Sequence, residues 1–116
     1  MYEKSAEKAL QRLWEVTQGK KLSLLSICRL LQIKVKWTEG SHFSSGYAVV
    51  TGEKAYILLK SGQSGAECSA TLAHELAHIL LGHLGDWMDI EGRKLSSEQQ
   101  EQEANHFASN ILKLCK

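Results

Sequence analysis

The residues that most clearly indicate chemistry are two histidines and a glutamate, His74, Glu75 and His78, in the sequence HELAH. Residues four apart in an α-helix differ by about 40° and one turn, so both imidazoles point the same way and can bind one ion. Glu75 lies beside them, where its carboxylate reaches a metal-bound water instead of the metal. Three protein ligands and a water make a catalytic zinc site, in which the metal lowers the pKa of the water. The pattern therefore predicts one Zn²⁺ per chain, bound by His74 and His78, with Glu75 as the catalytic base.

A chance occurrence of this pattern is the alternative interpretation. With average residue usage, HExxH arises in roughly one chain of this length in several hundred. Here, however, the motif lies in a segment that is predicted to be a buried helix. Two histidines and a glutamate inside an apolar helix cost several kcal/mol unless something pairs with them. A metal ion supplies that partner, which favours the functional interpretation.

The third ligand does not follow the metzincin pattern, in which a histidine stands six residues after the second motif histidine. Gly82 and His83 occupy the fourth and fifth places instead. On a helical wheel His83 points about 180° away from His74. It is therefore expected either to lie at the helix end, where the dipole favours it, or to orient a ligand by hydrogen bonding.

The C-terminal segment offers a glutamate as the third ligand. The apolar face of the helix predicted there consists of Ala104, Phe107, Ala108, Ile111 and Cys115. Glu101 lies about 60° from the centre of this face, Glu103 about 100° on the other flank, and His106 about 160°. We therefore favour Glu101 over Glu103 as the ligand and expect Glu103 and His106 on a solvated face. Asn105, one turn after Glu101, is placed to orient a metal ligand by a hydrogen bond without binding the metal itself.

These motifs resemble the ImmA/IrrE family of metallopeptidases. The resemblance rests on the segment HELAHILLGH at 74–83, followed by Glu101, Ala104, Asn105, Phe107 and Ala108. It extends over roughly residues 57–112 and implies that His74, His78 and Glu101 are the zinc ligands and Glu75 the catalytic glutamate. Members of the family typically cleave a transcriptional repressor encoded nearby, often on a phage or another mobile element.

The motif and the resemblance together predict a zinc-dependent metalloendopeptidase that acts on a repressor-like regulatory protein. One alternative is a protein-binding regulator that keeps the zinc site and no longer cleaves, although the intact Glu75 favours the enzyme. Another is a structural zinc domain, which would show a fourth protein ligand. The group that stabilises the oxyanion stays open among four hydrogen-bond donors, His42, Tyr47, Tyr56 and His83.

The elements that must position these residues indicate an α+β fold. Apolar spacing predicts helices at 3–17 and 23–31, and alternation predicts a strand at 33–37. Two β-rich runs at 47–51 and 55–60 predict a hairpin across Gly52. We expect a small antiparallel sheet of about three strands, packed with helices around a central, buried HExxH helix. The C-terminal helix would supply the third ligand.

The motif helix is expected to begin at a capping box formed by Ser64 and Glu67 and to run to Leu84, with Gly85 as its stop. It is apolar on two faces, which is typical of a helix buried in the middle of a fold. A peptidase must also hold its substrate extended, and an exposed strand edge does this by adding the substrate to the sheet. The run 55–60 directly precedes the motif helix, so we expect it to be the edge strand beside the zinc.

Composition limits the class of protein. Its 116 residues indicate a single metallopeptidase domain, 1–116. With 14 Lys and Arg against 13 Asp and Glu, the net charge is +1, so no direct nucleic-acid partner is expected. The N-terminus lacks the apolar core of a signal peptide, and no run approaches the length of a membrane span. Three widely spaced cysteines form no CxxC pair and favour free thiols and a cytoplasmic location.

Overall fold

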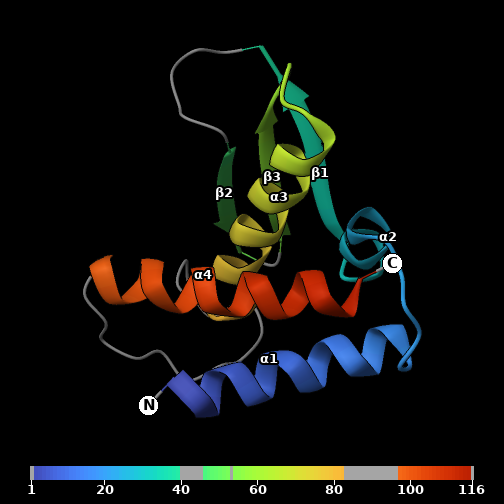
Figure 1. The fold of residues 1–116 in the computed structure, drawn as a ribbon, viewed down its shortest axis with the longest axis vertical. Coiled ribbons are helices and arrows are strands. Elements are labelled where there is room, and N and C mark those ends of the chain that lie inside the picture. Colours follow the sequence, from blue (N-terminus) through green and yellow to red (C-terminus); the bar gives the residue numbers. More distant parts are fainter. Residues whose placement is uncertain (1, 40–45, 53, 83–96, 116) are drawn as a thin grey trace.

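A computed structural model describes residues 2–39, 46–52, 54–82 and 97–115, and these ranges form an α+β fold (Figure 1). The elements in chain order are α1 (Tyr2–Thr17), α2 (Leu24–Leu30), β1 (Ile33–Thr38), β2 (Gly46–Thr51), β3 (Lys54–Lys60), α3 (Gly65–Leu80) and α4 (Ser97–Leu114). The predicted fold class is therefore confirmed. In Figure 1, α3 lies against the sheet, α4 crosses one end of α3, and α1 runs on the other side of α4. No helix within the described ranges is both long and apolar enough to cross a membrane.

The sheet is mixed, whereas the sequence led us to expect an antiparallel one. Its strand order is β1-β3-β2. β3 follows β2 through the turn at Gly52, whose φ is +61°, and pairs with β2 antiparallel, with Ala48 opposite Ile57. β3 thereby lies between the other two strands and pairs with β1 parallel, with Val35 opposite Ile57.

The position of β3 contradicts the prediction that residues 55–60 form the sheet edge beside the zinc. Both sides of β3 are paired within the domain, so substrate cannot add to it. Its composition gives the physical reason. Residues 55–59 are all apolar, as is typical of an internal strand, whereas β1 carries exposed Lys34 and Lys36, which are typical of an edge. Among the described strands, β1 and β2 are the edges.

The motif helix α3 begins as predicted and ends earlier. Ser64 is its N-cap, and the Ser64 hydroxyl accepts a hydrogen bond from the backbone N–H of Glu67 at 3.2 Å. The helix ends at Leu80 instead of Leu84, because Gly82 adopts a positive φ of +75° and its N–H bonds back to the carbonyl of Ile79 at 3.1 Å. The predicted stop, Gly85, lies outside the described residues.

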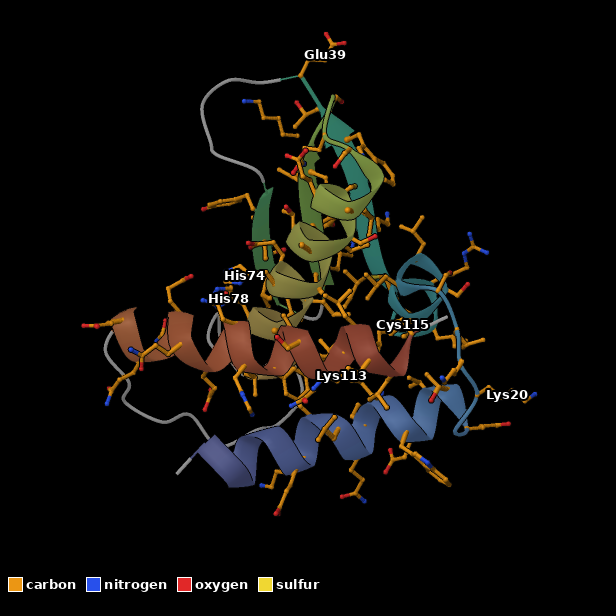
Figure 2. The ribbon with its side chains drawn as sticks, in the orientation of Figure 1. Lys20, Glu39, His74, His78, Lys113 and Cys115 are labelled. Carbon is orange, nitrogen blue, oxygen red and sulfur yellow. The ribbon has the colours of Figure 1, made fainter. Side chains whose placement is uncertain are left out.

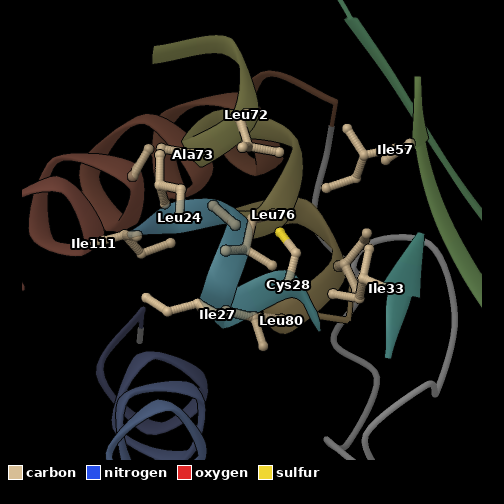
Figure 3. Close-up of a cluster of buried hydrophobic side chains, with 14 of the residues drawn as sticks. Leu24, Ile27, Cys28, Ile33, Ile57, Leu72, Ala73, Leu76, Leu80 and Ile111 are labelled. Carbon is tan, nitrogen blue, oxygen red and sulfur yellow. The ribbon is translucent and has the colours of Figure 1, made fainter. Parts of the chain in front are cut away.

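The hydrophobic core surrounds α3 on more than one side, as its two apolar faces predicted. Leu72, Ala73, Leu76, Ala77, Ile79 and Leu80 are all buried. Figure 3 shows Leu72, Leu76 and Leu80 packed among side chains from α2, the sheet and α4, including Ile27, Cys28, Ile33, Ile57 and Ile111. A helix enclosed in this way is held rigidly, and this rigidity is what a metal site needs of its scaffold.

Candidate metal centre

Helix α3 brings the two motif histidines together as their spacing predicted. His74 and His78 lie one turn apart, and their Nε2 atoms are 3.1 Å from each other. The rings meet edge to face, with centroids 4.7 Å apart and an interplanar angle of 86°. His78 is buried and His74 half-buried, and both lie where α4 crosses the end of α3 (Figure 2).

Glu101 completes the cluster from α4. One of its carboxylate oxygens lies 3.1 Å from Nε2 of His74 and the other 3.0 Å from Nε2 of His78. Its side chain is 57% exposed, so the carboxylate lies on the solvent side of the two histidines. The three residues chosen from the sequence thus converge, with ligand atoms within 4.8 Å of one another.

The three groups form a donor set that fits a cation. A neutral imidazole carries one N–H, and a carboxylate accepts only. If each Nε2 donates to Glu101, two N–H groups face one another across 3.1 Å. Ligands at about 2.0–2.1 Å from a tetrahedral zinc would lie roughly 3.3–3.4 Å apart. The observed separations of 3.0–3.1 Å are close to that value, so a Zn²⁺-sized ion needs only small movements to be bound by His74, His78 and Glu101.

Glu75 stands beside this cluster and is held from strand β2. Burial raises the pKa of the Glu75 carboxyl. His74 lowers it, Glu101 raises it, and a hydrogen bond from the backbone N–H of Ala48 lowers it. A Cβ added at Gly46 would lie 2.5 Å from Cγ2 of Thr71 and 3.4 Å from Cγ of Glu75, so β2 can approach α3 this closely only because residue 46 is a glycine.

An open cleft gives access to the centre. Its volume is about 510 Å³, and it is lined by Gly46, Ala70, Thr71, His74, Glu75, Glu101 and Asn105. Asn105 therefore borders the site, as we expected of a residue that could orient a ligand. Ala70, one turn before His74 on α3, is exposed at this cleft. The contributions of Gly46, Ala48 and Thr71 were missed, because no local signal in the sequence places β2 beside α3.

Other predicted residues have different outcomes. Glu103 is buried, with 2% of its surface exposed, so its placement on a solvated face was wrong. His106 is exposed as predicted. Tyr47 is exposed on β2, Tyr56 is half-buried on β3, and neither is among the described residues that line the cleft. His42 and His83 lie outside the described residues, so their proposed roles stay predictions.

Comparison with known sequences adds one finding. Residues 28–112 match the sequence model of a peptidase family, M78, described as the IrrE N-terminal-like domain. The matched segment runs from within α2 to near the end of α4 and so includes the whole sheet, α3 and Glu101. No curated protein and no solved structure matches the chain significantly.

Proposed function

We propose that this chain, which belongs to the peptidase family of IrrE N-terminal-like domains, is a zinc-dependent metalloendopeptidase. The observation that carries the proposal is the convergence of His74, His78 and Glu101 beside Glu75 in an open cleft. Three ligands on one side of an accessible site are typical of a catalytic zinc centre, whereas a structural centre has four protein ligands. Within the described part of the chain, no other His, Cys, Asp or Glu joins this group.

Each residue has a task in peptide hydrolysis. Zinc bound by the three ligands supplies a Lewis acid that lowers the pKa of water. Glu75 accepts the proton of the attacking water and delivers it to the amine nitrogen that leaves. Its partial burial and its hydrogen bond from Ala48 keep the carboxylate in one position between these two transfers. General acid–base catalysis of this kind contributes about 10²–10⁴-fold to the rate.

The substrate we propose is a regulatory protein of the repressor type, encoded near this chain's own gene on a phage or mobile element. The position of edge strand β2 at the cleft favours an extended polypeptide as substrate, because β2 begins at Gly46 in the cleft wall. In the described residues β2 pairs on one side only, with β3. A substrate strand added along its free side would have its backbone groups paired while one carbonyl reaches the metal.

The test uses the zinc-loaded chain and the product of the neighbouring gene. The wild type should bind one zinc per chain, measured by mass spectrometry of metals, and release discrete fragments of that protein. Glu75→Gln should keep the zinc and the unfolding curve and lose at least about 100-fold in rate, since the amide cannot accept a proton. Equal cleavage by this variant would contradict the assignment of the base.

A second outcome would favour the non-cleaving regulator. In that case the wild type binds zinc and forms a complex with the neighbouring protein, and this protein stays intact for as long as the complex is kept. If the wild type and Glu75→Gln bind the neighbouring protein equally and neither produces fragments, the chain is a docking protein and not an enzyme.

A further inference from the structure

A second cavity lies away from the metal centre, between α1, the start of α2 and the end of α4. Its volume is about 370 Å³, and it is lined by Leu10, Leu13, Trp14, Thr17, Gly19, Lys20, Lys21, Ile27, Ile111 and Leu114. Figure 2 shows Lys20 just beyond the end of α1, on the same side of the molecule as the end of α4. Ile111 follows Glu101 by ten residues on α4, about 15 Å along the helix axis, so the two cavities are separate.

The wall of this cavity is apolar and partly open to solvent. Trp14 is 67% exposed and Leu114 51%, although both are large hydrophobic residues. The Trp14 indole lies over the turn at the end of α1, since a Cβ added at Gly19 would be 3.4 Å from its Nε1. Apolar cavities of a few hundred Å³ with a small number of polar groups are typical of sites for small molecules.

The charged groups of the cavity are all positive. Gln18 and Gly19 end α1 with φ angles of +54° and +75°, and this turn brings Lys20 and Lys21 to the rim. No carboxylate is among the described residues that line the cavity. An apolar wall with two ammonium groups at its edge complements a ligand that has an apolar body and an anionic end.

Most of the cavity wall lies outside the segment that matches the family model. The matched family segment is 28–112, and of the ten lining residues nine lie outside it, Ile111 being the exception. The family's peptidase function therefore gives no reason for these side chains to surround an open apolar space. We propose that this cavity binds a small apolar anion, such as a medium-chain carboxylic acid, with Lys20 and Lys21 at its carboxylate. The inference does not depend on peptidase activity.

The experiment measures binding of dodecanoate below its micelle-forming concentration to the full chain by calorimetry, with dodecanol as the uncharged analogue. One dodecanoate should bind per chain and quench the fluorescence of Trp14. Trp14→Phe should remove the quenched signal and thereby identify its source. Dodecanol should bind about fivefold more weakly, because two exposed charges together contribute roughly this factor.

Matched charge reversals test the lysines. The double variant Lys20→Glu/Lys21→Glu should weaken the binding of dodecanoate at least about fivefold. Lys34→Glu/Lys36→Glu changes the net charge equally on exposed positions of β1 and should leave the affinity unchanged. Zinc binding by both variants reports that each is folded.

Three results of the binding measurements would overturn the proposal. They are the absence of saturable binding at millimolar dodecanoate, equal affinity for dodecanol, and equal behaviour of the two double variants. The last would show that Lys20 and Lys21 serve only the negative end of the α1 dipole. If sedimentation shows a dimer and Trp14 is shielded from solvent in it, a second copy of the chain covers this surface. That result would overturn the proposal as well.

Discussion

The close approach of β2 to α3 makes Gly46→Ala the most informative single substitution. The added methyl would lie 2.5 Å from Cγ2 of Thr71, so either the Thr71 side chain must rotate, at the expense of its hydrogen bond to Gln63, or one of the two elements must move. It would also lie 3.3 Å from the carbonyl oxygen of Leu58 and 3.4 Å from Cγ of Glu75. A movement of β2 or α3 that relieves the contact therefore shifts β2 relative to the Glu75 side chain.

The size of the effect follows from two opposing contributions. Forcing an extra methyl group into a packed site costs about 1–3 kcal/mol. Replacing glycine by alanine in a strand returns roughly 0.5–1 kcal/mol, because the unfolded chain loses freedom. The free energy of unfolding should thus fall by about 1–2 kcal/mol. Peptidase activity should fall further than stability, since misplacement of a catalytic group by 1 Å can cost about 100-fold in rate.

Urea unfolding at constant m-value measures the stability change, and two variants control it. Gly65→Ala, at the start of α3, meets nothing within 4 Å and should be neutral or stabilising. Thr71→Ser removes only the clashing methyl and keeps the hydroxyl that donates to the side-chain oxygen of Gln63 at 3.1 Å. Combined with Gly46→Ala it should restore stability, with a coupling energy of about 1 kcal/mol. Independent effects of the two substitutions, or equal stability of the two alanine variants, would refute the reasoning.

Three further outcomes are expected. Glu101→Ala should weaken zinc binding by more than about 100-fold, since even residues that only hydrogen-bond to a metal ligand contribute about 10–100-fold. Glu103→Ala, at a buried position, should keep zinc and lower the free energy of unfolding by about 1–3 kcal/mol. The reverse pattern in metal titrations would show that the wrong glutamate was chosen. A chelator should lower the melting temperature of the wild type but not of Glu101→Ala, because free zinc at 100 times its Kd stabilises the folded chain by about 2.7 kcal/mol. Burial raises the pKa of the Cys28 thiol to about 12, with a smaller contribution from Cys115, so the unfolded chain releases this proton at lower pH than the folded one. The free energy of unfolding should therefore fall by roughly 1.4 kcal/mol per pH unit above about pH 9. Unfolding curves measured from pH 8 to 11 check this, and Cys28→Ala should remove that part of the loss.

Features that depend on neighbours along the chain could be predicted from the sequence. The helical spacing of His74 and His78 determines that their imidazoles meet, and Ser64 begins α3 through a contact only three residues long. Alternation predicted β1, and Gly52 marked the turn of the hairpin. For the histidines, Ser64 and the hairpin, the interaction partner is at most one helical turn or one hairpin away. Strand β1 pairs with the more distant β3, but its alternation of apolar and polar residues is local, so periodicity contains the information.

Features that depend on distant pairing could not be predicted in this way. Strand order depends on which runs bury their apolar side chains best, and the run 55–59 is so apolar that it is paired on both sides. Our docking prediction assumed that the strand nearest to α3 in sequence is also nearest in space to the cleft. Instead β2 borders the cleft, through Gly46, and no local pattern in the sequence marked this glycine as part of the site.

The two glutamates of α4 show where the helical wheel succeeds and where it fails. Measured from the centre of the apolar face, Glu101 was closer than Glu103, and Glu101 is the residue that meets the histidines. Yet Glu101 is exposed and Glu103 buried, because burial follows the rows of a packed helix and not the angle alone. Glu103, Phe107 and Ile111 are spaced by four residues and form one row, and all three are buried. A ligand to a surface metal needs only to reach the rim of the interface, whereas a residue in the packed row must enter it. On α4, therefore, the carboxylate on the exposed flank reaches the two histidines, and the carboxylate within the row is enclosed in the core.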